Sequence, residues 1–387
     1  MPVTPKTSAG VLAPEMALSH LLNFSRALAA LLVLFFHIRT ALAVPYDALD
    51  VHNWLTRAVY TISTFGHEAV IVFFVLSGFL VGGAVLKMDM KSSDDFWAYW
   101  IDRTVRIGPV LIAATAFSAV LQHTAPLPGC SDTVVTVLGN ALAIQNFAVK
   151  PLCNNLPLWS ISNEVVYYFA FPVVVAAFSR VFSAWLAISL LCVTLVGVLS
   201  LSLAPLDDTN IVFDFPFWLV GAALWFVPGN FQRLRWLALL MVAAALLFGR
   251  FELSKNYFWL RDLFLAAGFS FLLVTFFNRP MPQCGIRATV ANYFANCSRW
   301  FADLSFSLYV THYPLIKLYV YLVLNAGRHE VRYTSITPRI VLEFMGLSAF
   351  CILIAFAFSV LFERPRRLFK RAIVRGLRIS SRRHSEP

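Results

Sequence analysis

Arg26 and His37 lie eleven positions apart in a segment, 21–44, that is otherwise apolar enough to cross a membrane. Eleven residues at 100° each exceed three full turns by only about 20°, so both side chains are expected on one face of a helix. At 1.5 Å per residue they stand about 16 Å apart along the axis, roughly half the hydrocarbon core. Ionisable groups at such depth are costly unless they face protein or a wet cavity, so this pair is our first functional candidate.

The two side chains suit different chemistry. An imidazole exchanges protons near neutrality and is a candidate general base, whereas a guanidinium binds anionic oxygens. Each residue also has a plain structural interpretation. His37 could hydrogen-bond a neighbouring carbonyl in a packed core, and Arg26 could be a membrane anchor whose charge reaches the surface.

A second pair of arginines, Arg103 and Arg106, lies at i and i+3 on the approach to another apolar segment. Two guanidinium groups on one helix face are suited to binding phosphates, although positive charge at an inner membrane surface explains them as well. Glu164 lies a few residues inside a further apolar segment. A carboxylate there is expensive, so it is a candidate for catalysis or acceptor binding, or it pairs with a basic group such as Arg39.

Several hydroxyl and imidazole groups occur within or beside the apolar segments. We assign them roles on the side of the site that would bind an acceptor substrate, or roles that support the site. Polar contacts between helices are the alternative. They are Ser160, Ser162, Ser305, Tyr309 and His312.

The composition indicates which elements must position these residues. Of 387 residues, 59% are hydrophobic and 13% charged, and 36 are Phe. A soluble protein of this length could not bury so much apolar surface, so the sequence predicts an all-α, polytopic membrane bundle of about ten transmembrane helices. The predicted spans are 21–44, 66–86, 105–123, 159–178, 183–203, 211–227, 235–250, 258–277, 301–324 and 340–363.

Charge distribution sets the predicted orientation. With ten spans and both termini inside, most of the 31 Lys and Arg residues fall in the N-terminal segment, the inner loops and the tail. Segment 133–149 is an eleventh candidate, but it is short and contains three amide side chains, so we expect a re-entrant or surface helix. The net charge of +11 is therefore mainly a topology signal. The basic tail suits anionic lipid headgroups, and no nucleic-acid partner is expected.

We expect a single membrane domain at 21–363, between an N-terminal cytoplasmic segment at 1–20 and a basic cytoplasmic tail at 364–387. The first 20 residues lack the pattern of a cleaved signal peptide. Charges inside spans would also suit a transporter or flippase for a glycan or small solute. The lack of a repeated half and of paired broken helices argues against that alternative.

Two of the six cysteines, Cys130 and Cys153, fall in the same predicted outer loop, 124–158. In an oxidising compartment they are candidates for a disulfide. The sequence contains no CxxC motif and no histidine cluster, so no metal site is expected.

Six short motifs in this order resemble the membrane-bound acyltransferase-3 family. They are the Arg-x10-His helix (Arg26 to His37), the FFVLSGFL run (Phe73 to Leu80), the RxxRIxP entry (Arg103 to Pro109), the WSxSxE segment (Trp159 to Glu164), the SxSLYxxHxP segment (Ser305 to Pro314) and the closing ERP (Glu363 to Pro365). Two positions depart from the pattern: Ile71 stands where many members have an acidic residue, and Asn163 where members commonly have an apolar one.

The resemblance implies an acetyl-CoA-dependent O-acyltransferase of the bacterial inner membrane, with a carbohydrate acceptor on a polysaccharide, lipid-linked glycan or lipo-oligosaccharide. It implies that His37 acts as general base or carries the acyl group transiently, with Glu164 as a second catalytic candidate. Arg26, Arg103 and Arg106 would bind acyl-CoA. The acceptor's identity and the oligomeric state are not encoded in any motif that we identify.

Overall fold

The computed structural model describes residues 17–87, 93–178, 211–227, 231–249, 258–277, 285–324 and 332–376. Within these ranges the regular structure is helical and contains no strand, which confirms the predicted all-α fold. The α-helices are α1 (Ala17–Leu42), α2 (Trp54–Ser63), α3 (Gly66–Ser77), α4 (Gly83–Lys87), α5 (Ser93–Thr124), α6 (Val134–Ala141), α7 (Trp159–Phe178), α9 (Ile211–Ala223), α10 (Arg235–Phe248), α12 (Phe258–Val274), α13 (Gly285–Val323), α14 (Pro338–Phe358) and α15 (Arg366–Gly376). Two π-helical segments, η2 (Gly78–Gly82) and η6 (Ser359–Glu363), extend α3 and α14.

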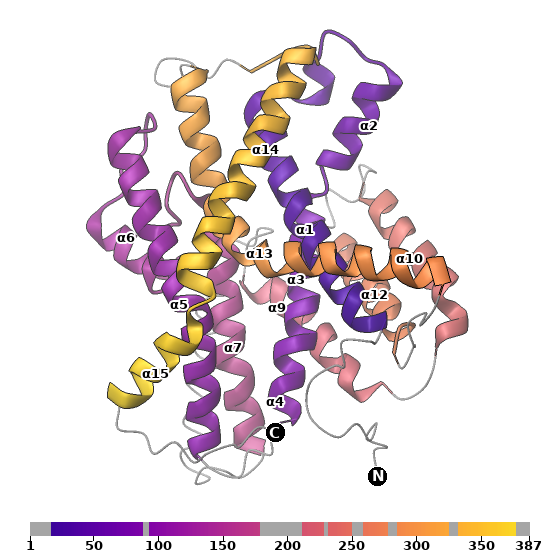
Figure 1. Ribbon diagram of the computed structural model, residues 1–387, viewed down its shortest axis with the longest axis vertical. Helices are drawn as coiled ribbons and strands as arrows, with labels where there is room; N and C mark the ends of the chain where they lie inside the picture. The colour runs from indigo at the N-terminus through magenta and orange to yellow at the C-terminus, as the bar shows by residue number, and fades with distance from the viewer. Residues whose placement is uncertain are drawn as a thin grey trace.

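A helix coincides with every predicted span except 183–203, which lies outside the described residues. Four helical segments in the described ranges are long and apolar enough to cross a membrane: Ala17–Leu42, Trp54–Leu86, Trp97–Thr124 and Pro338–Arg371. The structure therefore supports a membrane protein, whereas the full set of ten spans stays a prediction. In Figure 1, α5 and α14 run along the long axis of the molecule, and the first part of α13 crosses that direction.

Segment 133–149 does not form a membrane span. Only Val134–Ala141 is helical, and eight residues cover about 12 Å, far less than the hydrocarbon core. Beyond the end of this helix, Ala143 and Asn146 have positive φ angles of 57° and 76°, which turn the chain back on itself. The segment is therefore not an eleventh span, as expected, and its place as a re-entrant or surface helix stays a prediction.

Helix α1 lies between two apolar cores. Its Leu22, Ala29 and Val33 belong to the larger core, and its Leu34 and Ile38 belong to the smaller one. Its most extensive packing is against α13. Because apolar neighbours surround α1 on both sides, its polar residues are oriented by packing.

Three glycines allow α3 and η2 to approach α9 closely. A Cβ atom added to Gly78 would lie 1.8 Å from the carbonyl oxygen of Trp218, and one added to Gly221 would lie 2.1 Å from the oxygen of Val75. A Cβ added to Gly82 would lie 2.6 Å from the Cβ of Ala222. Small residues four positions apart permit this kind of backbone contact between membrane helices. The glycine of the FFVLSGFL run, Gly78, thus has a packing role, as do Gly82 and Gly221.

Candidate active site

The packing of α1 against α13 brings Arg26 to Ser305. The Nη2 atom of Arg26 donates a hydrogen bond of 3.3 Å to Ser305 Oγ, and Ser305 in turn donates to the carbonyl of Ala302 at 2.7 Å. Arg26 is half-buried and also lies within electrostatic reach of Arg106, Glu363 and Asp303. It is therefore held inside the bundle and does not extend freely to the membrane surface.

Six of the predicted site residues line one cavity. The cavity encloses about 830 Å³ of empty space, including its open mouth, and its apolar walls come from α3, α5, α7 and α13. The predicted residues that line it are Arg26, Arg106, Ser160, Glu164, Ser305 and Tyr309. Two guanidinium groups, one carboxylate and several hydroxyls in an apolar cavity match the general character of a small-molecule binding site.

Glu164 is the end of a chain of hydrogen bonds from three buried residues. The indole Nε1 of Trp218 donates to Ser77 Oγ at 3.1 Å, Ser77 Oγ lies 3.0 Å from the hydroxyl of Tyr168, and that hydroxyl donates to Glu164 Oε1. An indole nitrogen is only a donor, so Ser77 accepts from Trp218 and directs its own hydrogen to Tyr168. Every hydrogen in this series of bonds points toward Glu164, whose Oε1 atom is the final acceptor.

His37 and His312 form a second polar site. Their Nδ1 and Nε2 atoms, respectively, lie 3.0 Å apart, and Tyr313 contacts the His37 ring edge-on at a centroid distance of 5.0 Å. Neither histidine lines the cavity that contains Glu164. Tyr309 connects the two sites, because its ring lines the cavity and lies 5.9 Å from the ring of His312.

Two predicted residues, Arg103 and Ser162, lie elsewhere. Arg103 sits over the ring of Tyr99 at 5.6 Å and does not line the cavity. Ser162 is buried and donates to the backbone carbonyl of Gln145, so it fastens the outer loop to α7. Arg39, considered above as a partner for Glu164, instead lies over the rings of Phe36 and Tyr60.

Four acidic residues have no assigned function. We assign them structural roles, and the same holds for Asn163, which departs from the family pattern. Asn163 is buried and donates to Asp214 at 3.0 Å, which explains a polar residue at this position. Asp262 accepts from His67 at 2.9 Å and from Arg261 at 2.8 Å. The other acids are Glu343, which pairs with Arg339 at 2.8 Å, and Asp303, which is exposed.

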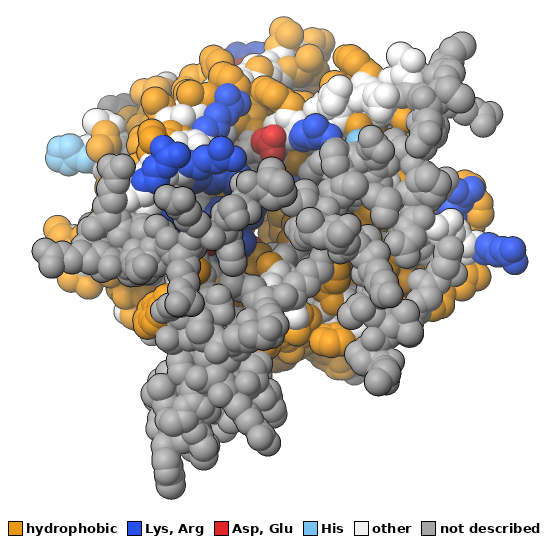
Figure 2. All heavy atoms as spheres, turned by 60° about the horizontal axis from the view of Figure 1, so that its bottom comes forward, with side chains coloured by type: hydrophobic (Ala, Val, Ile, Leu, Met, Phe, Trp, Pro, Cys, Tyr) orange, Lys and Arg blue, Asp and Glu red, His pale blue; other side chains and the backbone are white. Residues whose placement is uncertain are grey.

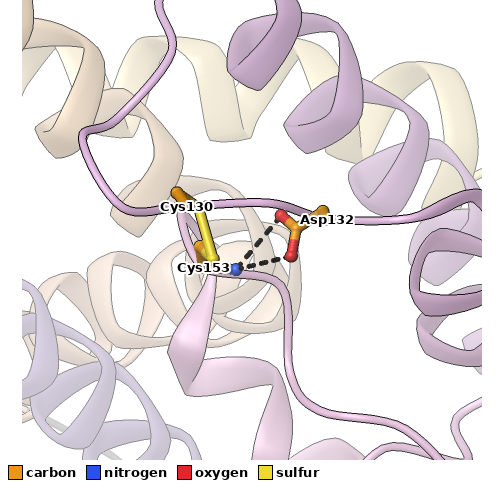
Figure 3. Close-up of side chains that lie close together, drawn as sticks. All are labelled: Cys130, Asp132 and Cys153. Carbon is orange, nitrogen blue, oxygen red and sulfur yellow. Dashed lines mark hydrogen bonds between the residues drawn. A yellow bond between two sulfur atoms is a disulfide. The ribbon is translucent and has the colours of Figure 1, made fainter.

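The loop at 124–158, predicted to be an outer loop, contains a disulfide between Cys130 and Cys153 (Figure 3). Both carboxylate oxygens of Asp132 accept from the backbone N–H of Cys153, at 3.3 and 3.2 Å. Burial raises the pKa of Asp132, and this hydrogen bond opposes the shift. Although ligand atoms of these three residues lie within 4.8 Å of one another, sulfur atoms in a disulfide do not provide the thiolates that a metal requires.

A basic face lies at one end of the bundle. Figure 2 shows Lys and Arg side chains gathered on the face that comes forward from the bottom of Figure 1. A second hollow, lined in part by Arg364, Arg366 and Arg367, lies beside η6 and the start of α15. Its Glu363 accepts from Ser307 of α13 at 2.7 Å. This hollow borders the residues around Arg26, because Asp303 and Glu363 interact electrostatically with that arginine.

The sequence did not identify Tyr168, Trp218 or Asn155 as part of the polar framework. A tyrosine and a tryptophan in apolar segments resemble ordinary core residues, and nothing local indicates that Trp218 reaches Ser77. Asn155 donates to Ser118 Oγ at 3.0 Å and to the carbonyl of Val310 at 2.9 Å. Pro314 has no N–H, so the sequence indicated that the Val310 carbonyl needs a donor from outside the helix. It did not indicate that Asn155 is that donor.

Comparisons with known proteins identify relatives of this sequence. A family model described as an acyltransferase domain matches residues 20–364. The acyltransferase MdmB of Streptomyces mycarofaciens is 32% identical over 123 residues, which cover 30% of this chain and 30% of that protein. No solved structure matches. Since the family model covers most of the sequence, from residue 20 to residue 364, this chain belongs to the acyltransferase-3 family.

Proposed function

We propose that this protein transfers an acetyl group from cytoplasmic acetyl-CoA to a hydroxyl of a cell-surface or lipid-linked carbohydrate. The observation that carries the proposal is the arrangement along α1. Arg26 faces a cavity with Arg106 and Glu164, and His37, three helical turns farther along, lies beside His312. One helix therefore joins an anion-binding region to a proton acceptor.

The cavity supports the binding of an anionic donor. Arg26 and Arg106 offer guanidinium groups to phosphate oxygens, and the apolar walls suit the acyl and pantetheine parts of a thioester. Basic side chains at the adjacent end of the bundle favour entry of coenzyme A from that side. By the positive-inside rule that side is the cytoplasm, with both termini cytoplasmic, in a bacterial inner membrane.

The reaction needs a base for the acceptor hydroxyl, and His37 is our candidate. The hydroxyl oxygen attacks the thioester carbonyl as His37 takes its proton; the C–S bond breaks and the proton passes to the coenzyme A thiolate. Transient transfer of the acyl group to His37 is a second route that uses the same ring. Glu164 and the hydroxyls around it offer hydrogen-bond partners to bound substrate.

Mass spectrometry of surface glycans tests the proposal in cells. Substitution His37→Ala should abolish the acyl ester at an unchanged protein level, whereas His123→Ala, an exposed histidine at the end of α5, should leave the ester intact. An ester retained in His37→Ala would overturn the assignment of the base.

A binding measurement separates the enzyme from a transporter. Purified protein should bind and slowly hydrolyse acetyl-CoA, and Arg106→Gln should weaken binding, with the exposed Arg57→Gln as control. A transporter for a glycan or small solute should do neither.

A further inference from the structure

The hydrogen bonds of His312 determine which of its ring nitrogens carries hydrogen. Its Nδ1 atom lies 3.0 Å from the carbonyl oxygen of Leu308 and 2.7 Å from that of Tyr309. Carbonyl oxygens only accept, so Nδ1 must be the donor. In a neutral ring the other nitrogen, Nε2, then has a lone pair and no hydrogen.

This assignment determines the tautomer of His37. The Nδ1 atom of His37 is 3.0 Å from His312 Nε2, so it must donate its hydrogen to that lone pair. A neutral His37 therefore has its own lone pair on Nε2. The ring is half-buried, and the carbonyl of Val33, one turn earlier on α1, lies near it as a further acceptor.

The opposite direction of the bond would require a charge on His312. If His312 donated from both nitrogens it would be an imidazolium, yet the residue is only 1% exposed. The contacts of its ring are with the helical carbonyls, His37, Tyr309 and Tyr313, and no carboxylate among the described residues is bonded to it. An unpaired charge buried in this way is costly, so the neutral form of His312 is favoured.

We propose that His312 is a positioning residue that keeps neutral His37 in its Nδ1–H tautomer, so that Nε2 is the reactive nitrogen. This inference rests on the proposed function. The proton of the acceptor hydroxyl moves to His37 Nε2 as the hydroxyl oxygen bonds to the thioester carbon, and it leaves with the coenzyme A sulfur when the C–S bond breaks. Throughout, His37 Nδ1–H donates to His312, which stabilises the imidazolium that forms. A transient acyl-histidine would use the same lone pair.

Nitrogen NMR tests the tautomer without any assay of activity. Protein with ¹⁵N-labelled histidine rings, compared with His37→Ala protein to assign the signal, should show His37 protonated at Nδ1. Free histidine prefers hydrogen on Nε2, so the two outcomes are distinct. A His37 ring protonated at Nε2 alone would overturn the proposal.

Two substitutions of matched size test the role of His312. The side-chain oxygen of glutamine in His312→Gln lies where Nε2 was and accepts from His37, whereas His312→Leu keeps volume but offers no acceptor. We expect His312→Leu to lower kcat by about 100-fold or more with KM for acetyl-CoA unchanged. The reference is the serine-protease triad, where a wrong histidine tautomer costs about 10⁴-fold. His312→Gln should keep kcat within about tenfold of the native value.

The outcomes are separable from those of the proposed function. If native protein transfers no acyl group, the proposed function fails while the NMR result still stands. If native protein transfers acyl groups and the two His312 variants have equal kcat, then His312 is a packing residue. If His312→Leu does not fold, the NMR measurement on native protein decides the proposal.

Discussion

Asn155 donates a hydrogen bond to the carbonyl of Val310, the carbonyl that Pro314 leaves without a partner in α13. The Asn155 side chain is fully buried and its Nδ2 also donates to Ser118 on α5. One amide group therefore links the end of the outer loop, α5 and the interrupted turn of α13, two residues before His312. The proline is tolerated because another segment satisfies the carbonyl.

A double-mutant cycle tests this relationship. Substitution Asn155→Leu should lower the free energy of unfolding by about 1–3 kcal/mol, because it leaves a buried carbonyl unsatisfied. With Pro314→Ala the helix regains an N–H for Val310, so Asn155→Leu should cost less in that background. Chemical unfolding in detergent measures both values, and the exposed neighbour Leu156→Ala serves as control. Purely additive effects would exclude the coupling.

The close approach of α3 and α9 predicts strong effects at two glycines. Substitutions Gly78→Ala and Gly221→Ala place a Cβ within 2.1 Å of a backbone oxygen of the facing helix, so the helices must separate. We expect a loss of stability of more than about 2 kcal/mol for each. The matched control is Gly346→Ala in α14, where no atom lies within 4 Å and alanine should stabilise the helix by about 0.5–1 kcal/mol. Equal stability of the three variants would contradict the packing argument.

The chain of hydrogen bonds that ends at Glu164 predicts a graded loss of activity. Leaving a buried hydrogen-bonding group unsatisfied costs about 1–3 kcal/mol, so Tyr168→Phe should lower kcat by roughly 10- to 100-fold if its bond to Glu164 orients the carboxyl group for the reaction. The bond from Trp218 is two steps away, so Trp218→Phe should cost less. Steady-state kinetics with acetyl-CoA provides the measurement, with the exposed Tyr293→Phe as control. If Tyr168→Phe has native kcat, the hydrogen bonds that lead to Glu164 have no functional role.

The disulfide predicts that the outer loop loses stability on reduction. A cross-link between residues 23 positions apart contributes about 3 kcal/mol through the unfolded chain. Cys130→Ser, Cys153→Ser and the double variant should therefore lower the melting temperature by similar amounts. The free Cys297→Ser is the control, and additive losses for the two bonded cysteines would contradict a shared bond.

The hydrogen bonds accepted by Asp50 predict a loss of stability at acidic pH. It accepts from the hydroxyls of Thr334 at 2.5 Å and Ser335 at 2.8 Å, and these hydrogen bonds lower the pKa of Asp50 below its ordinary value of 3.8. The ionised form is favoured in the folded state, so its stabilisation is present above pH 3.8 and is lost as pH falls through the lower folded-state pKa. Asp50→Asn should flatten this acid limb of an unfolding profile, and the exposed Asp47→Asn serves as the control.

The sequence by itself determined the class of the protein and much of the helix plan. Apolar runs bounded by loops predict helices wherever they occur, because a membrane requires internal backbone hydrogen bonding; Trp159–Phe178 was predicted to the residue. The eleven-residue spacing was enough to place Arg26 and His37 on one face of a helix. Motif order identified the family.

Contacts between helices were decided only by the tertiary structure. Glu164 lies with Arg26 and Arg106, whereas His37 pairs with His312, 275 residues away. Helical periodicity says which residues share a face but not which helix packs against it. The partners Tyr168, Trp218 and Asn155 look like ordinary core or loop residues in the sequence. They become informative only when packing excludes water and each buried donor must find an acceptor. The residues of α1 were enough to predict the helix and the face that carries Arg26 and His37. The partner of His37 depends on how α13 packs against α1.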